Sequence, residues 1–197
     1  MTNVDTYRPK IQLIYAAVGT LITFMFIWSS FYEGGATSET VSALVALFVL
    51  IFIYIFLIRP KIIFSDEGIV IVNPIEDVTI GWADVIELDA KWAMAIATEK
   101  FTVSSWVATA PGRHRNRGIH YTEIKGLNIE SGGSIRTADS PRSDSGAAAY
   151  RARVRLKRFQ DKGDIASLTT SRKRQVKPLA LAGLALVAAI ATNFFGH

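Results

Sequence analysis

The apolar residues of this chain gather in three long uncharged blocks, and the stretch between the second and the third is ordinary in polarity. The blocks run over residues 11–31, 41–58 and 178–195. A helix of about 20 residues rises roughly 30 Å, which matches the hydrocarbon core of a bilayer. The pattern therefore predicts three transmembrane helices, two near the N-terminus and one at the C-terminus.

The three blocks differ in their flanks and composition. The first is too long for the apolar region of a signal peptide, and a second block soon follows it, so we favour a span over a cleaved leader. The second block stops sharply at Arg59-Pro60-Lys61, where two charges and a proline end the helix. The third is rich in alanine, and the small residues Ala185 and Ala189 predict close approach of another helix.

The distribution of basic residues predicts the orientation of the spans. Of the 22 Lys and Arg residues, Arg8 and Lys10 precede the first span and all others lie between Arg59 and Lys177. The loop between the first two spans carries no Lys or Arg. By the positive-inside rule, the sequence predicts a multi-pass plasma-membrane protein with its N-terminus and central domain in the cytoplasm and its C-terminus outside.

The central stretch changes to a period of two, which is typical of β-strands. A region rich in Gly, Arg and Ser follows at 111–140, with a candidate strand at 119–123. A helix is then predicted from an N-cap region at 141–144 to its end at Lys162-Gly163. Its predicted buried residues are Ala148, Val154, Leu156 and Phe159. The predicted strands are 61–65, 69–72, 77–82, 85–89, 92–97 and 101–107.

Short strands joined by hairpins and followed by one helix predict an α+β domain with a small antiparallel sheet or barrel. The predicted organisation is therefore as follows. The segments are a cytoplasmic N-terminus (1–10), a transmembrane hairpin (11–58), a cytoplasmic domain (59–162), a basic juxtamembrane linker (163–177) and a third transmembrane helix (178–195).

Two short motifs resemble a known family. The run from Asp66-Glu67-Gly68 to Asn73-Pro74, followed by Ile80-Gly81-Trp82-Ala83-Asp84-Val85, is similar to membrane-anchored pleckstrin-homology-like (PH-like) proteins of actinobacteria, of the low-molecular-weight antigen type. The resemblance covers about residues 60–160. It implies a PH-like antiparallel β-barrel capped by one helix, in which Gly68 shapes a turn and Trp82 closes one end. Such domains generally act as binding or scaffolding modules.

The residues that carry chemistry in enzymes are sparse. The chain has no cysteine, and its three histidines stand in no metal-binding spacing. No nucleophile elbow, Walker motif or dinucleotide fingerprint occurs. The acidic pairs Asp66-Glu67 and Glu76-Asp77 are interpreted as solvated turn residues. We therefore predict a protein that is not an enzyme and binds no cofactor or metal.

Positive charge is concentrated late in the chain. Between Arg151 and Lys177 there are 10 basic residues and two acidic ones. Anchoring to anionic headgroups is the favoured interpretation, ahead of an acidic protein partner. Nucleic acid is excluded from the prediction because no aromatic residues are interleaved. The candidate contacts for a partner or headgroups are Arg113, Arg115, Arg117, Arg151, Arg155, Arg158, Arg172, Lys173 and Arg174.

These features predict a non-catalytic accessory, assembly or scaffold subunit of a larger bacterial membrane complex, with other membrane protein subunits and anionic lipid headgroups as partners. In the bacterial group that the resemblance names, one candidate host is the respiratory cytochrome supercomplex. The alternative is a membrane-tethered PH-like module that binds anionic lipid or a small ligand through the loop Arg113–Arg117. An enzyme with an unrecognised site is a third, weaker hypothesis.

Overall fold

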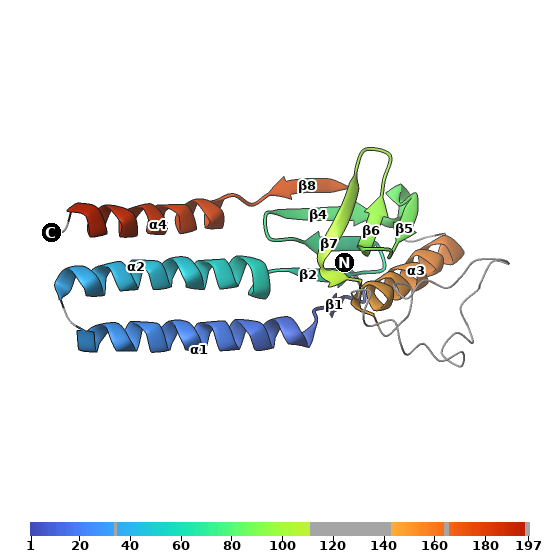
Figure 1. Cartoon of the computed structure of the whole chain (residues 1–197). Coiled ribbons are helices and arrows are strands. Elements are labelled where there is room, and N and C mark those ends of the chain that lie inside the picture. Colours follow the sequence, from blue (N-terminus) through green and yellow to red (C-terminus); the bar gives the residue numbers. More distant parts are fainter. Residues whose placement is uncertain (34, 111–142, 164–165, 196–197) are drawn as a thin grey trace. The chain divides into compact units, whose positions relative to one another are not determined.

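The computed structural model describes residues 1–33, 35–110, 143–163 and 166–195 (Figure 1). Its long helices are α1 (Lys10–Glu33), α2 (Ala36–Ile53), α3 (Asp144–Lys162) and α4 (Lys177–Phe195). A π-helical turn, η1 (Tyr54–Ile58), continues α2. The strands are β1 (Asp5–Tyr7), β2 (Lys61–Phe64), β3 (Gly68–Val72), β4 (Glu76–Gly81), β5 (Glu87–Asp89), β6 (Ala93–Ala97), β7 (Thr102–Thr109) and β8 (Ser171–Arg174).

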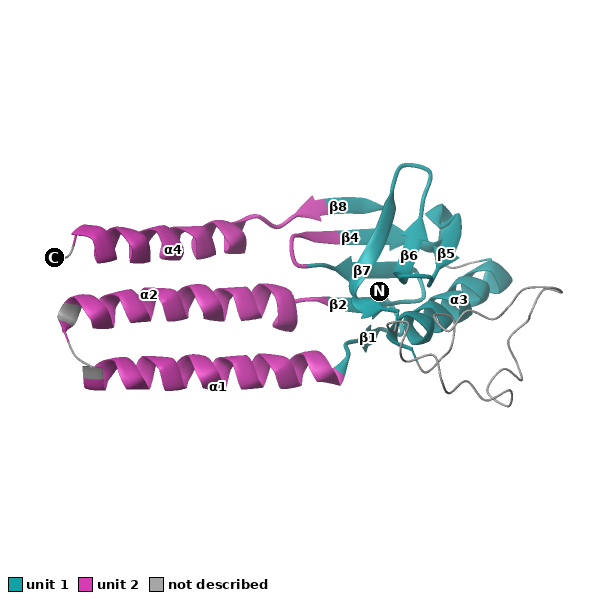
Figure 2. Ribbon diagram, viewed as in Figure 1, with its two compact units in different colours: residues 1–9, 61–73, 78–172 teal, residues 10–60, 74–77, 173–197 magenta. Residues whose placement is uncertain are grey.

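The described residues divide into two compact units, coloured separately in Figure 2. The helical unit comprises residues 10–60, 74–77 and 173–197. The β-rich unit comprises residues 1–9, 61–73 and 78–172. The chain therefore passes from one unit to the other five times, after residues 9, 60, 73, 77 and 172.

The helical unit contains the three long apolar helices that the sequence predicts. Three stretches are long and apolar enough to cross a membrane: Lys10–Tyr32, Thr37–Ile58 and Lys177–Phe195. Their mean hydropathy is 1.9, 3.1 and 1.9. α2 is the central helix of this unit, because it contacts both α1 and α4 (Figure 1).

Small side chains line both contacts of α2. On α1 the buried residues Ala16, Thr23 and Ser30 recur at seven-residue intervals and so share one face. On α4 the buried residues are Ala182, Ala185 and Ala189. Helices in lipid associate by van der Waals packing, which small residues favour by letting backbones approach closely. The packing predicted for Ala185 and Ala189 is confirmed, and the helix they meet belongs to the same chain.

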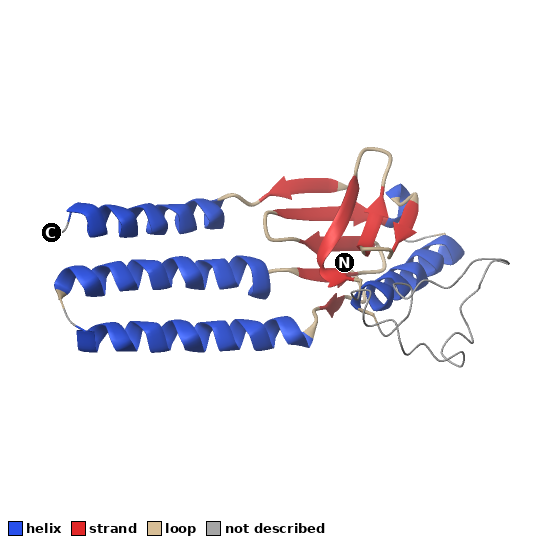
Figure 3. Cartoon of the chain, in the orientation of Figure 1, coloured by secondary structure: helices blue, strands red, loops and turns tan. Residues whose placement is uncertain are grey.

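The described strands form two antiparallel sheets, shown as arrows in Figure 3. The first has the order β1-β2-β3-β4-β8, and the second has the order β5-β6-β7. In the first sheet, Tyr7 pairs with Ile62 and Asp5 with Phe64. In the second, the turn predicted at 98–100 joins β6 to β7, with the Thr98 N–H donating to the Phe101 carbonyl over 2.9 Å.

The predicted closed barrel is wrong for the described strands, which stay in two separate sheets. β4 ends at Gly81, and the 3-10 turn η2 (Trp82–Asp84) interrupts the ladder before β5 begins. At the edge of β7, a side chain stands where a barrel would have a strand. The Asn73 amide donates to the Ser104 carbonyl and its oxygen accepts from the Trp106 N–H, both over 2.9 Å.

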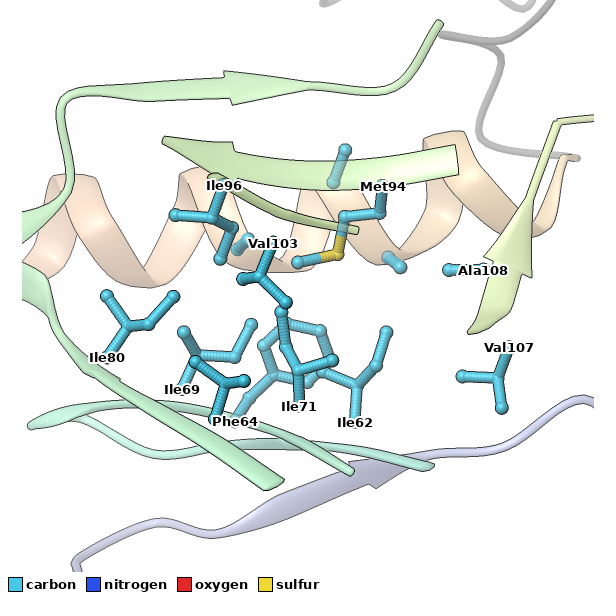
Figure 4. Packing of buried hydrophobic residues seen from close by; sticks show 14 of the residues in the cluster. Ile62, Phe64, Ile69, Ile71, Ile80, Met94, Ile96, Val103, Val107 and Ala108 are labelled. Atoms are coloured by element: carbon cyan, nitrogen blue, oxygen red, sulfur yellow. The ribbon is translucent and has the colours of Figure 1, made fainter. Parts of the chain in front are cut away.

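The core of the β-rich unit lies between the sheets and α3 (Figure 4). The alternation in the sequence fixes which strand residues enter it, because successive side chains point to opposite faces. α3 adds three alanines, Ala148, Ala149 and Ala152, all fully buried. The predicted burial of Ala148 is confirmed, whereas Val154 is 41 % exposed. The strand residues of the core include Ile62, Phe64, Ile69, Ile71, Val78, Ile80, Met94, Ile96, Val103 and Val107.

The ends of α3 follow the predicted capping chemistry. The Ser143 hydroxyl accepts from the Gly146 N–H over 2.9 Å, which satisfies one of the open donors of the first turn. At the other end Gly163 adopts φ 64°, a left-handed conformation that costs glycine little. The candidate strand at 119–123 lies outside the described residues.

Residues 166–170, here called the strap, lie against the motif around Trp82. The Leu168 N–H donates to the Glu67 carbonyl over 2.9 Å, and the Ala83 N–H donates to the Ser167 hydroxyl over 3.1 Å. A Cβ on Gly81 would stand only 2.0 Å from the Leu168 carbonyl oxygen. Glycine is therefore required here because another backbone lies against it.

Gly68 and Trp82 are both closely packed, but not in the roles that the sequence predicts, because Gly68 is the first residue of β3 without a positive φ and there is no closed barrel for Trp82 to cap. A Cβ on Gly68 would stand 2.5 Å from the Ile80 carbonyl oxygen. Trp82 is 1 % exposed, and its indole N–H donates to the Ser65 carbonyl over 3.0 Å. The buried indole thus keeps its one donor satisfied, as a large buried aromatic must.

Both ends of the β-rich unit extend beyond the predicted boundaries. The N-terminus contributes β1, and the segment predicted as a linker at 163–177 contains the strap and β8. Strands of three or four residues give too few alternations for a period to show. Their formation depends on neighbours that are distant in the sequence.

Replacing Gly81 with alanine tests the contact with the strap. We expect Gly81→Ala to lower the free energy of unfolding by about 2–4 kcal/mol, because the strap or β4 must shift. Gly183→Ala is the matched control, since nothing lies within 4 Å of its added Cβ. Thermal unfolding of the full chain in detergent, followed by tryptophan fluorescence, measures both. Equal midpoints for the two variants would contradict the close approach.

Candidate interaction surfaces

The basic face of α3 holds the segment that precedes α1. Arg151 pairs with Asp5 over 3.0 Å, and its guanidinium lies 5.3 Å from the centre of the Tyr7 ring. The Tyr7 hydroxyl donates to Asp144 over 2.6 Å. Arg155 donates to the Asn3 carbonyl over 2.6 Å. These contacts attach β1 to α3 as well as to β2.

The environment of Tyr7 keeps it a hydrogen-bond donor. Burial raises the pKa of the Tyr7 hydroxyl above its ordinary value, and the bond to the Asp144 carboxylate raises it further. The nearby Arg151 acts in the opposite direction and is outweighed. Tyr7 therefore stays protonated at neutral pH.

Asp66 is the second anchor of the α3 cations. Its carboxylate accepts from Arg155 over 3.1 Å and lies 3.5 Å from Arg158. The Arg155 side chain is 12 % exposed, so most of its surface is already covered within the unit. The sequence-based interpretation of Asp66 as a solvated turn residue is thus wrong, because two guanidinium groups face it.

β8 is different, because its bases point to solvent. It is an edge strand of the first sheet, and all four of its residues, Ser171–Arg174, are exposed. The Arg172 guanidinium lies 5.7 Å from the centre of the Phe101 ring, close enough for a cation–π contact. Of the described cations predicted to contact a partner or headgroups, Lys173 and Arg174 are both exposed.

Within the helical unit, Asp77 joins the ends of two long helices. Arg59, just beyond η1, pairs with the Asp77 carboxylate and donates to the Pro74 carbonyl over 3.2 Å. Gln175, two residues before α4, donates to the same carboxylate over 2.8 Å. The backbone N–H of Gln175 also donates to the Ile75 carbonyl over 2.6 Å. Asp77, near the start of β4, thus connects the end of η1 to the residues just before α4.

The sequence analysis missed this role of Asp77 and Gln175. It interpreted Asp77 as a solvated turn acid, yet the side chain is 28 % exposed and paired. The available signal was positional. Arg59 directly follows one apolar run and Gln175 stands three residues before another, so both lie near the ends of long helices, where polar partners are needed.

A small polar cleft lies in the β-rich unit beside β8. It has a volume of about 170 Å³ and is lined mainly by Asp84, Glu99, Lys100 and Thr170, together with Ile86. Water occupies about 30 Å³ per molecule in the liquid, so the cleft has room for only a few waters or a small ion. It is too small for a lipid headgroup with its glycerol.

The remaining predicted contacts, Arg113, Arg115 and Arg117, lie outside the described residues. Across the described ranges, no group of three or more His, Asp or Glu side chains is arranged to hold a metal ion. The structure thus collects the described candidate cations on two elements. α3 uses Arg151, Arg155 and Arg158 internally, and β8 presents its bases outward.

Comparisons with known proteins give no relatives: no family model, curated protein or solved structure matches the chain. The resemblance to PH-like proteins therefore stays a prediction.

Neutralising Asp77 tests the junction between α2 and α4. We expect Asp77→Asn to lower the free energy of unfolding by about 1–3 kcal/mol, because the Arg59 guanidinium loses its charged partner. Asp161→Asn, on an exposed carboxylate of α3, is the matched control and should cause no loss. Thermal unfolding in detergent measures both variants.

A double-mutant cycle with Arg59→Gln then isolates the pair. If the two substitutions add, the Arg59–Asp77 pair contributes nothing and the junction is not held by this contact.

Proposed function

We propose that this chain is a membrane-anchored, non-catalytic accessory or assembly subunit of a larger membrane complex, and that β8 is its docking surface for an acidic partner protein. The observation that carries the proposal is the exposure of Ser171–Arg174 at the edge of a five-stranded sheet. The candidate cations of α3, Arg151, Arg155 and Arg158, are already engaged within the chain.

Edge strands present unpaired backbone groups that another chain can extend. Three consecutive bases on such a strand repel a second copy of the same strand and favour an acidic one. The partner would therefore supply an extended segment or surface rich in Asp and Glu. Because only two residues separate β8 from α4, that partner would itself lie at the membrane surface.

The connections between the units support a docking role. The chain passes between them five times, and the peptide linking β1 to α1 and that linking η1 to β2 are each only two residues long. A domain on one long linker can search a large volume, whereas short connections leave little chain to extend between two units. Such an arrangement suits a subunit that binds a neighbour in the same membrane.

The finer assignments belong to this proposal. The charge asymmetry supports a plasma-membrane protein with its domain in the cytoplasm and its C-terminus outside. Antiparallel hairpins followed by one C-terminal helix, α3, support a PH-like origin for the domain. The respiratory cytochrome supercomplex of actinobacteria is the candidate host that this resemblance names.

The second candidate function is a tethered PH-like module that binds anionic lipid or a small ligand. The polar cleft beside Asp84 and Lys100 favours a small ligand over a lipid, because its volume is about 170 Å³. Recovery of the chain without partners, together with saturable binding of a small anion, would favour this function over docking.

Affinity purification tests the docking proposal. After gentle detergent extraction from native membranes, we expect the wild-type chain to bring down a partner in stoichiometric amount, identified by mass spectrometry. Lys173→Ala/Arg174→Ala should reduce the recovered partner at least about fivefold. Each lost charge is expected to weaken binding of the partner by about 1 kcal/mol or less.

The matched control removes two cations from α3, with Lys157→Ala/Lys162→Ala, and should retain the partner. Both residues are exposed. Purification of the wild-type chain alone would contradict the proposal, as would partner loss in the control but not in the β8 variant.

Single-cysteine labelling tests the orientation of the helices in the membrane. Because the chain has no native cysteine, only the introduced thiol can react. We expect Asn193→Cys, near the end of α4, to react with a membrane-impermeant maleimide on intact cells. Lys157→Cys, on α3, should react only after the cells are permeabilised. The reverse pattern would place the domain outside and overturn the assignment from the positive-inside rule.

A further inference from the structure

An apolar cleft opens in the helical unit between the end of α2 and the start of α4. Its volume is about 480 Å³, and its lining is Leu50, Ile51, Tyr54, Lys177, Pro178 and Leu181. The surface of the cleft is almost wholly apolar, so Tyr54 and Lys177 line it with their carbon atoms. Clefts of roughly 300–1,000 Å³ are those that hold one small ligand or part of a larger one.

The geometry of the two helices explains why this cleft exists. α4 approaches α2 through Ala182, Ala185 and Ala189, which are buried. At the start of α4 the small residues give way to Pro178 and Leu181. Pro178 is half-buried and rigid, so the first turn leaves space against Leu50 and Ile51. The contacts of Asp77 with Arg59 and Gln175 hold these two helix ends together.

Positive charge stands at the mouth of the cleft. Lys177 is exposed, and within the described part of the chain no carboxylate pairs with it. It is also the first residue of α4, where the open N–H groups of a helix carry partial positive charge. Arg59, by contrast, is neutralised by Asp77. The mouth thus combines an ammonium group with a helix N-terminus, and both attract an anion.

We propose that this cleft binds one anionic phospholipid, with an acyl chain along Leu50, Ile51 and Leu181 and the phosphate at Lys177. The cleft is at the helix ends, which is the depth at which a headgroup and the upper part of its chain meet in a bilayer. Tyr54 suits this position, because tyrosine places its ring in the apolar region and its hydroxyl at the interface.

A phospholipid fits the cleft better than a helix of another subunit does. A helix with its side chains is about 10–12 Å wide and needs a groove that runs along the helix pair. The cleft is confined to the end of the pair, and α4 is closely packed on α2 beyond it through Ala185 and Ala189. Charge also favours the lipid, because its phosphate would neutralise the Lys177 ammonium.

Native mass spectrometry of the full chain in detergent tests the proposal. The probes are dioleoyl phosphatidylglycerol and dioleoyl phosphatidylcholine, which have the same acyl chains and differ in net charge. We expect the wild-type chain to retain at least about five times as much of the anionic lipid as of the zwitterionic one. The reason is the attraction of one cation near the membrane surface for an anionic headgroup. Lys177→Gln should remove that preference.

A second pair of variants tests the cleft itself. Leu181→Trp fills it and should reduce retention of both lipids about fivefold or more, with all charges unchanged. Leu184→Trp is the matched control, because Leu184 is 66 % exposed and does not line the cleft. It should retain lipid as the wild-type chain does.

Equal retention of the two lipids by the wild-type chain would overturn the proposal. So would equal retention by the Leu181→Trp and Leu184→Trp variants, since binding would then not require the cleft. The lipid site does not rest on the docking role of β8. Failure of the partner purification leaves the lipid measurement intact, and the converse also holds.

Discussion

The pairing of β1 with β2 is the contact on which the rest of this structure depends. It joins the residues just before α1 to those just after α2, with Tyr7 opposite Ile62. The two ends of a helical hairpin thereby become neighbours in a sheet. Because strand pairing fixes register residue by residue, these connections need only two residues each. The N-terminal segment is part of the β-rich unit for this reason, and α3 secures it further through Arg151 and Asp144.

Polar groups in this protein are used mainly where chain segments must be joined. Asp77 connects Arg59 and Gln175 at the ends of two helices, and Asp66 collects Arg155 and Arg158. Asp66 lies in the turn before β3, and Asp77 lies near the start of β4. Their burial beside guanidinium groups costs little because each charge has a partner. Along β8, by contrast, three consecutive bases are exposed.

Packing in the two units follows different rules. In the β-rich unit, large apolar side chains from both sheets meet the alanines of α3, as removal from water favours. In the helical unit, the buried residues on α1 and α4 are small, and the large ones face outward. In lipid, exposing a leucine carries no penalty, so close backbone approach becomes the source of stability. Where that approach fails, at Pro178 and Leu181, a cleft remains.

The sequence by itself determined the three apolar helices, the hairpin strands, the caps of α3 and the small-residue face of α4. Each of these depends on local spacing or on residues within one turn. Only the tertiary structure decided that β1 and β8 are strands, that the sheets stay open at Asn73, and that Val154 is exposed while Ala149 and Ala152 are buried. It also decided that Asp66 and Asp77 are paired. These outcomes depend on partners far along the chain, and no local period records such contacts.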